Sequence, residues 1–357
     1  SFSNSSPNQV LYVKASSKYA CSKIATVTMS TATTVVPSPS PIAICDEDAI
    51  QDGLHPFNLG ALVTPQLLNG LPSGLAADYY LSFADALVEK NKIGPIFTNT
   101  QAFQQTIYTR IKNGLDCYGI TPVTLVVNTF DPVNFEEETT FLCSGSNLNL
   151  SVDSGFSSYL WNTGATTAAI TVQQAGTYTI TVTNDKGCKK TKTFIVKASE
   201  KATYENAVVK DFAGNKNTIT IQYKGTGDYE FSLDGTSYQE NATFTNVAPG
   251  SYTISIRDKN GCGITTSDLI YVLDYPRFFT PNGDGFNDTW KINNLGSLPQ
   301  SRIVIFDRYG KLLKELTTAD DSWNGTFTGA PLPSDDYWFQ LIFADGKIIK
   351  GHFSLKR

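Results

Sequence analysis

The feature that most constrains the fold is that the chain repeats itself in two places. Gln9–Met29 and Gln105–Leu125 share Gln, Tyr, a basic residue, Cys, Ile and a Val-Thr pair at one constant offset of 96 residues. Gly176–Cys188 and Gly250–Cys262 match in the same way at an offset of 74 residues. Apolar and polar residues alternate in each copy, which predicts strands with one buried face. The repeats therefore predict several small β-modules in series.

Composition supports this organisation and excludes two function classes. The 357 residues exceed one ordinary domain, and 41% hydrophobic with 17% charged residues is typical of folded domains. The net charge is -5 without a basic block, which argues against a nucleic-acid partner. No run of apolar residues approaches eighteen, so no helix is expected to span a membrane.

The last eighty or so residues resemble a known family in four separated blocks. These are Phe278–Ile292, Ile303–Leu313, Asp321–Phe343 and the stretch GKIIKGHFSLKR that ends at Arg357. Together they resemble the type B C-terminal sorting domain of the Bacteroidetes type IX secretion system, also called the gliding-motility-associated C-terminal domain. The resemblance implies export to the cell surface and association with the outer membrane. It also implies two partners, the type IX secretion machinery and an outer-membrane β-barrel protein of the PorP type.

Repeats and resemblance together predict five segments. The loop ICDEDAIQDGLHPFNL resembles tandem repeats of large Bacteroidetes surface adhesins, YLWNTGATTAAITV resembles PKD-like or immunoglobulin-like modules, and YEFSLDGTSYQ resembles the short repeats of gliding adhesins. We expect an all-β chain of tandem immunoglobulin-like or PKD-like β-sandwich modules in an elongated array. The predicted segments are the C-terminal part of a truncated adhesin repeat (1–38), a second module (39–131), a third module (132–198), a fourth module (199–274) and the terminal sorting domain (275–357).

Two local predictions refine this plan. Ala76–Asn91 forms either a short helix or a strand followed by a connection, and the pattern leaves both open. Asp234-Gly235 lies in the centre of a predicted hairpin and is a type I′ turn signal. The first residues, SFSNSSPNQV, lack the basic start and the apolar stretch of a signal peptide, so we expect them to belong to a longer precursor.

Six widely spaced cysteines predict disulfides within modules. Cys143 and Cys188 bracket Trp161, which is the cysteine–tryptophan–cysteine order of a sandwich with a pinned core. Cys45 and Cys117 bracket the second module in a similar way. We therefore predict Cys45–Cys117 and Cys143–Cys188 bridges, a partner for Cys21 in the missing part of its domain, and no partner for Cys262 within its own module. The alternative is that all six are buried thiols.

The sequence contains two acidic loops that could bind calcium. PNGDGFND places side-chain oxygens on a glycine-rich loop, at Asn282, Asp284, Asn287 and Asp288. The alternative is a turn in which these side chains cap their own backbone. The loop with Asp46, Asp48 and Asp52 allows the same two interpretations. No other cofactor is expected.

Signals for enzyme chemistry are missing from the sequence. The two histidines, His55 and His352, are far apart, and neither GxSxG nor HExxH occurs. Trp323, Tyr337 and Trp338 are aromatic residues that either stack on sugar rings or fill a small core. We therefore expect the chain not to be an enzyme.

The basic C-terminal strand is the predicted docking element for the barrel partner, because a free strand edge can pair with another chain. Its residues are Lys350, Gly351, His352, Phe353, Ser354, Leu355, Lys356 and Arg357. The leading hypothesis is the stalk and the secretion and anchoring signal of a surface adhesin. The alternatives are the spacer and sorting region of a secreted enzyme whose catalytic domain lies upstream, and a carbohydrate-binding module.

Overall fold

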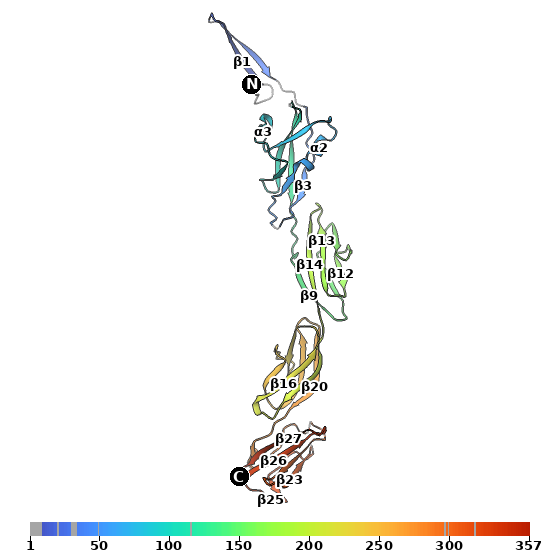
Figure 1. The fold of residues 1–357 in the computed structure, drawn as a ribbon, viewed down its shortest axis with the longest axis vertical. Helices are drawn as coiled ribbons and strands as arrows, with labels where there is room; N and C mark the ends of the chain where they lie inside the picture. The colour runs from blue at the N-terminus through green and yellow to red at the C-terminus, as the bar shows by residue number, and fades with distance from the viewer. Residues whose placement is uncertain are drawn as a thin grey trace. The chain divides into compact units, whose positions relative to one another are not determined.

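A computed structural model describes residues 9–19, 21–29, 34–48, 50–114, 116–295, 298, 300–317 and 319–357 (Figure 1). Internal contacts divide the chain into two compact units, and both contain parts of the third module. Unit 1 comprises Ser1–Glu138, Leu150–Ile170 and Thr177–Ile195, and unit 2 comprises Thr139–Asn149, Thr171–Gly176 and Val196–Arg357. Strands dominate both units, which confirms the all-β prediction. Within these residues no helix is long and apolar enough to cross a membrane.

The 96-residue repeat is visible in the backbone pairing. Strands β1 (Gln9–Ser16) and β2 (Ser22–Met29) form an antiparallel hairpin, as do β7 (Gln104–Asn113) and β8 (Asp116–Asn128). Gln9 pairs with Met29 and Ala15 with Lys23, and the residues 96 positions later pair in the same register. The two hairpins are therefore copies of one structural element.

The second module is a four-stranded sheet with short helices. The sheet order is β3-β8-β7-β5, where β3 spans Ile42–Cys45, β5 spans Ala76–Tyr80, and β3 runs parallel to β8. A small sheet pairs β4 (Pro56–Asn58) with β6 (Ile96–Thr98). The helices are α1 (Leu59–Leu62), α2 (Thr64–Leu68) and α3 (Phe83–Val88). The core contains fully buried apolar side chains from these elements, among them Phe57, Leu59, Val63, Ile107, Ile111 and Val123.

Both interpretations of Ala76–Asn91 hold in part. The stretch begins as strand β5 and continues as helix α3. Ser82 separates them because its Oγ accepts a hydrogen bond from the backbone N–H of Asp85 (3.0 Å) and so caps the helix. Glu89 ends the helix in a left-handed conformation.

The third module contains six strands, of which four form the sheet β11-β13-β14-β9. Trp161, in β11, is buried and stacks on Phe194, in β14, with ring centroids 5.8 Å apart. This aromatic pair forms the predicted core around the tryptophan. The strands are β9 (Glu138–Cys143), β10 (Leu148–Ser151), β11 (Ser158–Trp161), β12 (Ala169–Val172), β13 (Gly176–Thr183) and β14 (Lys189–Ser199).

The fourth module packs two three-stranded sheets, β15-β16-β18 and β17-β19-β20, around a shared core. Phe231, Ile254 and Ile256 are fully buried between them. The elements are β15 (Thr203–Lys210), a 3-10 turn η1 (Gly214–Lys216), β16 (Asn217–Lys224), β17 (Tyr229–Ser232), β18 (Thr243–Val247), β19 (Gly250–Asp258) and β20 (Gly263–Val272).

The type I′ prediction for Asp234-Gly235 is wrong. A type I′ turn needs positive φ at both central residues, but only Gly235 has it, with φ at 76°. Asp234 instead accepts hydrogen bonds from the backbone N–H groups of Ser237 (2.7 Å) and Thr236 (2.8 Å). These bonds lower the pKa of the Asp234 carboxyl well below its ordinary value. The residue builds a wider capped loop rather than a two-residue turn.

The terminal domain is a five-stranded sheet, β21-β27-β26-β22-β23, with an aromatic core on one face. Phe353 lies at the centre of this core, stacked on Trp290 at 3.9 Å between ring centroids. The strands are β21 (Phe278–Phe279), β22 (Arg302–Phe306), β23 (Leu312–Leu316), β26 (Asp335–Ile342) and β27 (Ile348–Leu355), with the small pair β24 (Thr326–Phe327) and β25 (Ala330–Pro331) beside them in sequence.

We predict that Phe353→Ala lowers the stability of the terminal domain by about 3–5 kcal/mol, because it removes a fully buried aromatic ring. Urea unfolding monitored by tryptophan fluorescence measures this loss. The exposed neighbour Lys350 provides the matched control, and Lys350→Ala should change stability by less than about 0.5 kcal/mol. Equal stability of the two variants would contradict the proposed core.

Candidate functional site

The disulfides join neighbouring modules, so the prediction of Cys45–Cys117 and Cys143–Cys188 bridges is wrong. Cys45 of the second module bonds to Cys188 of the third, with Cα atoms 5.4 Å apart. Cys143 of the third module bonds to Cys262 of the fourth, with Cα atoms 5.3 Å apart. The prediction that Cys262 has no partner within its own module is confirmed.

The length of strand β8 explains why Cys45 cannot reach Cys117. Cys45 pairs with Asn128 at the end of β8, whereas Cys117 lies at the beginning of the same strand, eleven residues earlier. Eleven residues of extended chain span about 36 Å, and a disulfide needs Cα atoms within about 7 Å. The two cysteines therefore lie at opposite ends of their module.

Strand β14 separates the cysteines of the third module in the same way. Cys188 directly precedes β14. Cys143 ends β9, and the next residue, Ser144, donates its backbone N–H to the carbonyl of Ser199 at the other end of β14 (2.9 Å). Eleven residues again separate the two ends, about 36 Å. Cys45 and Cys143 lie beside the residue at which the chain leaves their module, and we call them exit cysteines. Cys188 and Cys262 lie in the following module and bond back to the preceding one, and we call them entry cysteines.

The first junction is reinforced around the bridge. The linker residues Phe130 and Phe135 both contact Phe156 of the third module edge-on, with ring centroids 5.7 and 5.9 Å apart. Lys190 Nζ binds Asp131 Oδ1 at 2.7 Å. The Phe130 N–H also donates to Gln51 Oε1 (2.6 Å), which ties the linker to the acidic loop of the second module.

That acidic loop closes on its own backbone. Asp46 is buried, and its Oδ2 accepts the Gly53 N–H at 2.8 Å. The Asp48 carboxylate accepts a hydrogen bond from the Ile50 N–H (2.8 Å), and the Asp52 carboxylate accepts one from the Leu54 N–H (2.9 Å). These hydrogen bonds correspond to the alternative in which the side chains cap their own backbone. The contact between Phe130 and Gln51 places the loop beside the first junction.

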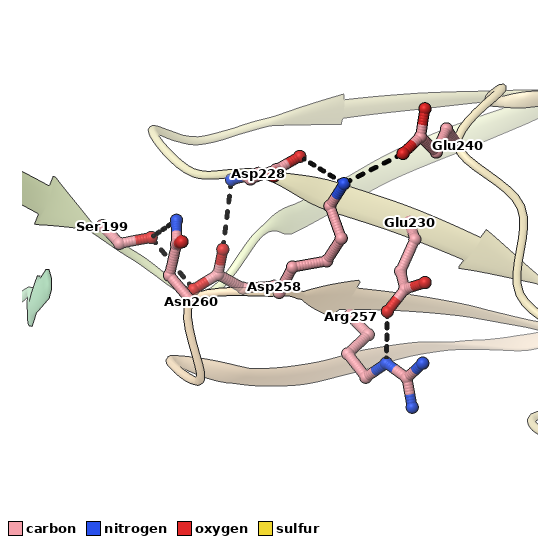
Figure 2. A network of polar contacts seen from close by, with 8 residues as sticks. Ser199, Asp228, Glu230, Glu240, Arg257, Asp258 and Asn260 are labelled. Carbon is pink, nitrogen blue, oxygen red and sulfur yellow. Dashed lines mark hydrogen bonds and ion pairs between the residues drawn. The ribbon is translucent and has the colours of Figure 1, made fainter. Parts of the chain in front are cut away.

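The second junction centres on a buried carboxylate, shown in Figure 2. Asp258 accepts hydrogen bonds from the Ser199 hydroxyl (2.9 Å), the Asp228 N–H (3.1 Å) and the N–H of Cys262 itself (3.0 Å). The Asn260 side chain also donates to Ser199 Oγ (3.1 Å). Because Ser199 is the last residue of β14, this network holds the chain exit of the third module against the bonded hairpin of the fourth.

A second set of contacts extends this junction along the linker. Glu200 and Thr226 bind each other twice, through Glu200 N–H to the Thr226 carbonyl and Thr226 N–H to Glu200 Oε1, both at 2.7 Å. The Tyr229 hydroxyl donates to the Glu200 carbonyl (2.9 Å). Lys259 Nζ forms ion pairs with Asp228 Oδ1 (3.0 Å) and Glu240 Oε1 (3.1 Å), and both carboxylates are labelled in Figure 2. These pairs are solvated and contribute little to stability.

The PNGDGFND loop also closes on its own backbone. Asp288 accepts the N–H groups of Gly283 (2.7 Å) and Gly285 (2.8 Å). The Phe286 N–H and the Asn282 side chain donate to Asp284 and lower the pKa of its carboxyl. Asn287 adopts a left-handed conformation, and its backbone carbonyl accepts a hydrogen bond from the Thr280 N–H (2.8 Å). The described residues contain no group of three or more His, Cys, Asp or Glu side chains placed to hold a metal ion, and the loop's carboxylates serve as caps.

The eight residues predicted for docking divide between the core and the surface. Phe353 and Leu355 are buried in the domain core, and Ser354 pairs with β21. Arg357 Nε donates to the Leu332 carbonyl (3.0 Å), so its guanidinium has a structural role. Gly351 is half-buried, and the exposed residues of the set are Lys350, His352, Lys356 and Arg357. Strand β27 has β26 on one side and the two-residue β21 on the other, so only part of its edge is free.

The outward face of the terminal sheet carries a row of aromatic and aliphatic side chains, of which the sequence indicated His352 and Trp338 as candidates but not Phe306 and Leu312. His352, Trp338, Phe306 and Leu312 pair in register across β27, β26, β22 and β23. Trp338 is 41% exposed and Leu312 is 51% exposed. Two shallow hollows adjoin Trp338 and Phe306, one reaching Arg308 and the other Lys350. We call these four residues, together with the flanking cations Arg308 and Lys350, the outward row. The alternation of buried and exposed residues along β26 and β27 is the sequence signal that could have predicted its Trp338 and His352.

The other aromatic candidates are core residues. Trp323 and Tyr337 are each 2% exposed, and Trp323 Nε1 donates to the Thr326 carbonyl (2.9 Å). The sugar-stacking interpretation is therefore wrong for these two residues and remains open only for Trp338. His55 belongs to the second module and His352 to the terminal sheet.

Comparison with known families assigns two parts of the chain. Residues 41–132 match the Flavobacterium inter-domain disulphide bond domain, and residues 273–354 match the CHU_C type IX secretion signal domain. The first match covers the exit cysteine Cys45, which forms an inter-module bridge here. The second identifies the terminal domain as a sorting signal. The chain is thus cargo of the type IX secretion system, exported to the cell surface or the extracellular space.

Similar solved structures are tandem immunoglobulin-domain proteins. Sidekick-1 immunoglobulin domains 1–5 match 91% of this chain and 80% of that chain at 10% identity (TM-score 0.28). The N-terminal eight domains of Down syndrome cell adhesion molecule match 98% and 47% at 12% identity (0.26). Titin domains I67–I69 match 62% and 95% at 12% identity (0.26). TM-scores this low carry no argument about the fold or function of this chain. No curated protein shows significant similarity to the chain.

We predict that cutting the linker between the second and third modules does not separate the two halves of the oxidised chain. A sequence-specific protease site inserted after Asn134 lies between Cys45 and Cys188, so the bridge should hold the fragments together. A non-reducing gel should show one band after cleavage and two bands after reduction. The Cys45→Ser variant is the control and should give two bands without reductant. If the unsubstituted chain gives two bands before reduction, the prediction is contradicted and the bridges lie within modules.

Proposed function

We propose that the chain is the stalk and the secretion and anchoring region of a cell-surface adhesin, and that it is not an enzyme. The observation that carries the proposal is the pair of inter-module bridges beside an export signal. Consecutive modules linked covalently at both junctions transmit tension without relying on the linkers alone. A protein that connects a distant ligand to the cell needs this property.

The chemistry of the described surface also supports a structural role. The two histidines lie in different modules, and no cluster of titratable side chains of a metal-binding kind occurs among the described residues. The buried carboxylate Asp258 is occupied by three donors at the second junction, which suits a structural group rather than a general acid or base.

We further propose that the terminal domain docks on an outer-membrane β-barrel protein of the PorP type through the outward row. Exposed apolar rings flanked by cations are typical of binding hot spots, where aromatic residues carry most of the affinity. Trp338 and His352 are adjacent rings, 6.4 Å apart, and Lys350 and Arg308 adjoin the hollows beside them. This surface replaces the terminal strand edge as the preferred contact, because Phe353 and Leu355 are occupied in the core.

Two other functions remain as alternatives. The same modules could serve as the spacer and sorting region of a secreted enzyme, because a sorting domain does not depend on the nature of its cargo. A carbohydrate-binding module is favoured by a single observation, the exposed ring of Trp338. A glycan array with the purified chain distinguishes the carbohydrate function from docking on a barrel protein.

We predict that Trp338→Ala weakens binding of the terminal domain to its barrel partner by about 30-fold or more, the effect of losing one hot-spot aromatic. Equilibrium binding to the detergent-solubilised barrel protein measures this change. Phe286→Ala is the control, since Phe286 is a more exposed ring (76%, against 41% for Trp338) on the PNGDGFND loop of the same domain. Normal binding by Trp338→Ala with loss of binding by Phe286→Ala would move the interface to that loop.

A further inference from the structure

The junction between the fourth module and the terminal domain is built without a disulfide. The terminal domain contains no cysteine, whereas each of the two upstream junctions carries a bridge. The chain crosses this third junction through residues 273–277, which connect β20 to β21. Any fixed arrangement of the two domains must therefore come from noncovalent contacts of this linker and of the fourth module.

The linker is part of the core of the terminal domain. Leu273 is buried in that core. The Tyr275 ring contacts the rings of Phe339 and Trp290, with centroids 4.7 and 6.2 Å apart. Trp290 Nε1 donates a hydrogen bond to the Pro276 carbonyl (2.8 Å). The linker thus packs against the terminal sheet and is not a free tether between two domains.

A loop of the fourth module reaches the same core. Phe212 follows β15, and its side chain packs against the core cluster of the terminal domain. Its ring lies 6.0 Å from the Tyr275 ring, measured between centroids. The Phe212 N–H donates to the Leu273 carbonyl (3.0 Å), and the Phe212 carbonyl accepts a hydrogen bond from the Arg277 guanidinium (2.8 Å). Phe212 therefore binds the linker through its ring, its N–H and its carbonyl.

The fourth module holds this loop in its conformation. Phe212 has a φ of 61°, a left-handed conformation that is unfavourable for a bulky side chain and persists only where the surroundings fix it. The fixing group is Asn217, which is fully buried. Its Oδ1 accepts the Ala213 N–H (2.9 Å), and its Nδ2 donates to the carbonyls of Gly214 (2.6 Å) and Val247 (3.0 Å). The loop is thus prepared by its own module to receive the linker.

We propose that the loop 211–217 is a latch that completes the core of the terminal domain, and that the secretion machinery receives residues 199–357 as one folded unit. The proposal rests on the assignment of the terminal domain as the sorting signal. That family match begins at residue 273, so the latch lies outside the matched segment. The sorting unit of this chain is therefore larger than the matched domain. Two domains that share a core stabilise each other, and the coupling is reciprocal.

The first test is hydrogen exchange of the full oxidised chain carrying Phe212→Ala. Exchange of the amides in β26 and β27 should become about tenfold faster or more, because the terminal core loses a contact made by another module. Exchange in β19 should stay slow and report that the fourth module is folded. Val208→Ala is the control, since Val208 is 48% exposed on β15 of the same module, and it should change neither region. Unchanged exchange in β26 and β27 of Phe212→Ala would overturn the proposal.

The reciprocal variant, Phe353→Ala, leaves the sequence of the fourth module intact. It weakens the terminal core, and the amides of the latch should then exchange faster while those of β19 remain protected. This measurement decides the coupling even if Phe212→Ala disturbs the fold of its own module. Unchanged exchange of the latch in Phe353→Ala would show that the loop closes without the terminal domain, and the proposal would be wrong.

Export of the full chain tests the functional part of the proposal. Labelling of intact cells should find several-fold less Phe212→Ala than Val208→Ala at the surface, at equal total amounts in the culture. A chain truncated before residue 273 tests the sorting assignment itself, which fails if that chain is still displayed. If the truncated chain is retained but Phe212→Ala is displayed normally, the assignment holds and the proposed two-domain sorting unit is overturned.

Discussion

The length of the closing strands determines the covalent structure of this chain. Strands β8 and β14 each separate the two cysteines of their module by eleven residues, about 36 Å of extended backbone. Neither module can therefore close a disulfide on itself, and Cys45, Cys143 and Cys188 each bond to a cysteine of an adjacent module. The bridges Cys45–Cys188 and Cys143–Cys262 consequently overlap in sequence.

The overlapping bridges bond the third module covalently to both the second and the fourth module. The buried contacts at each junction agree with this covalent plan. Phe156 receives the linker rings at the first junction, and Asp258 binds Ser199 and Cys262 at the second. The terminal domain has no cysteine, so its core of aromatic and aliphatic side chains is not reinforced by a disulfide. Its independence from the bridges suits a domain that the secretion machinery handles as a signal.

The sequence allowed the all-β class and the sorting domain to be predicted, because repeats and motifs are local properties of the chain. The disulfide pairing was wrong, since cysteine order in the sequence does not reveal which end of a strand each cysteine occupies. Strand length was the missing quantity: the run from Cys117 to Asn128 is too long for its ends to meet. The docking residues were assigned as a contiguous stretch, but alternation along β27 places Phe353 and Leu355 in the core and His352 outside.

The most direct test of the account is the contour length of the chain pulled from its two ends in a single-molecule force experiment. Across both bridges the shortest path runs through residues 1–45, back from 188 to 143, and through 262–357, roughly 185 residues. This predicts a fully extended length of about 650 Å when oxidised and about 1,250 Å after reduction. Bridges within the second and third modules would leave roughly 240 residues in the path, or about 850 Å, and that length in the oxidised chain would contradict the account.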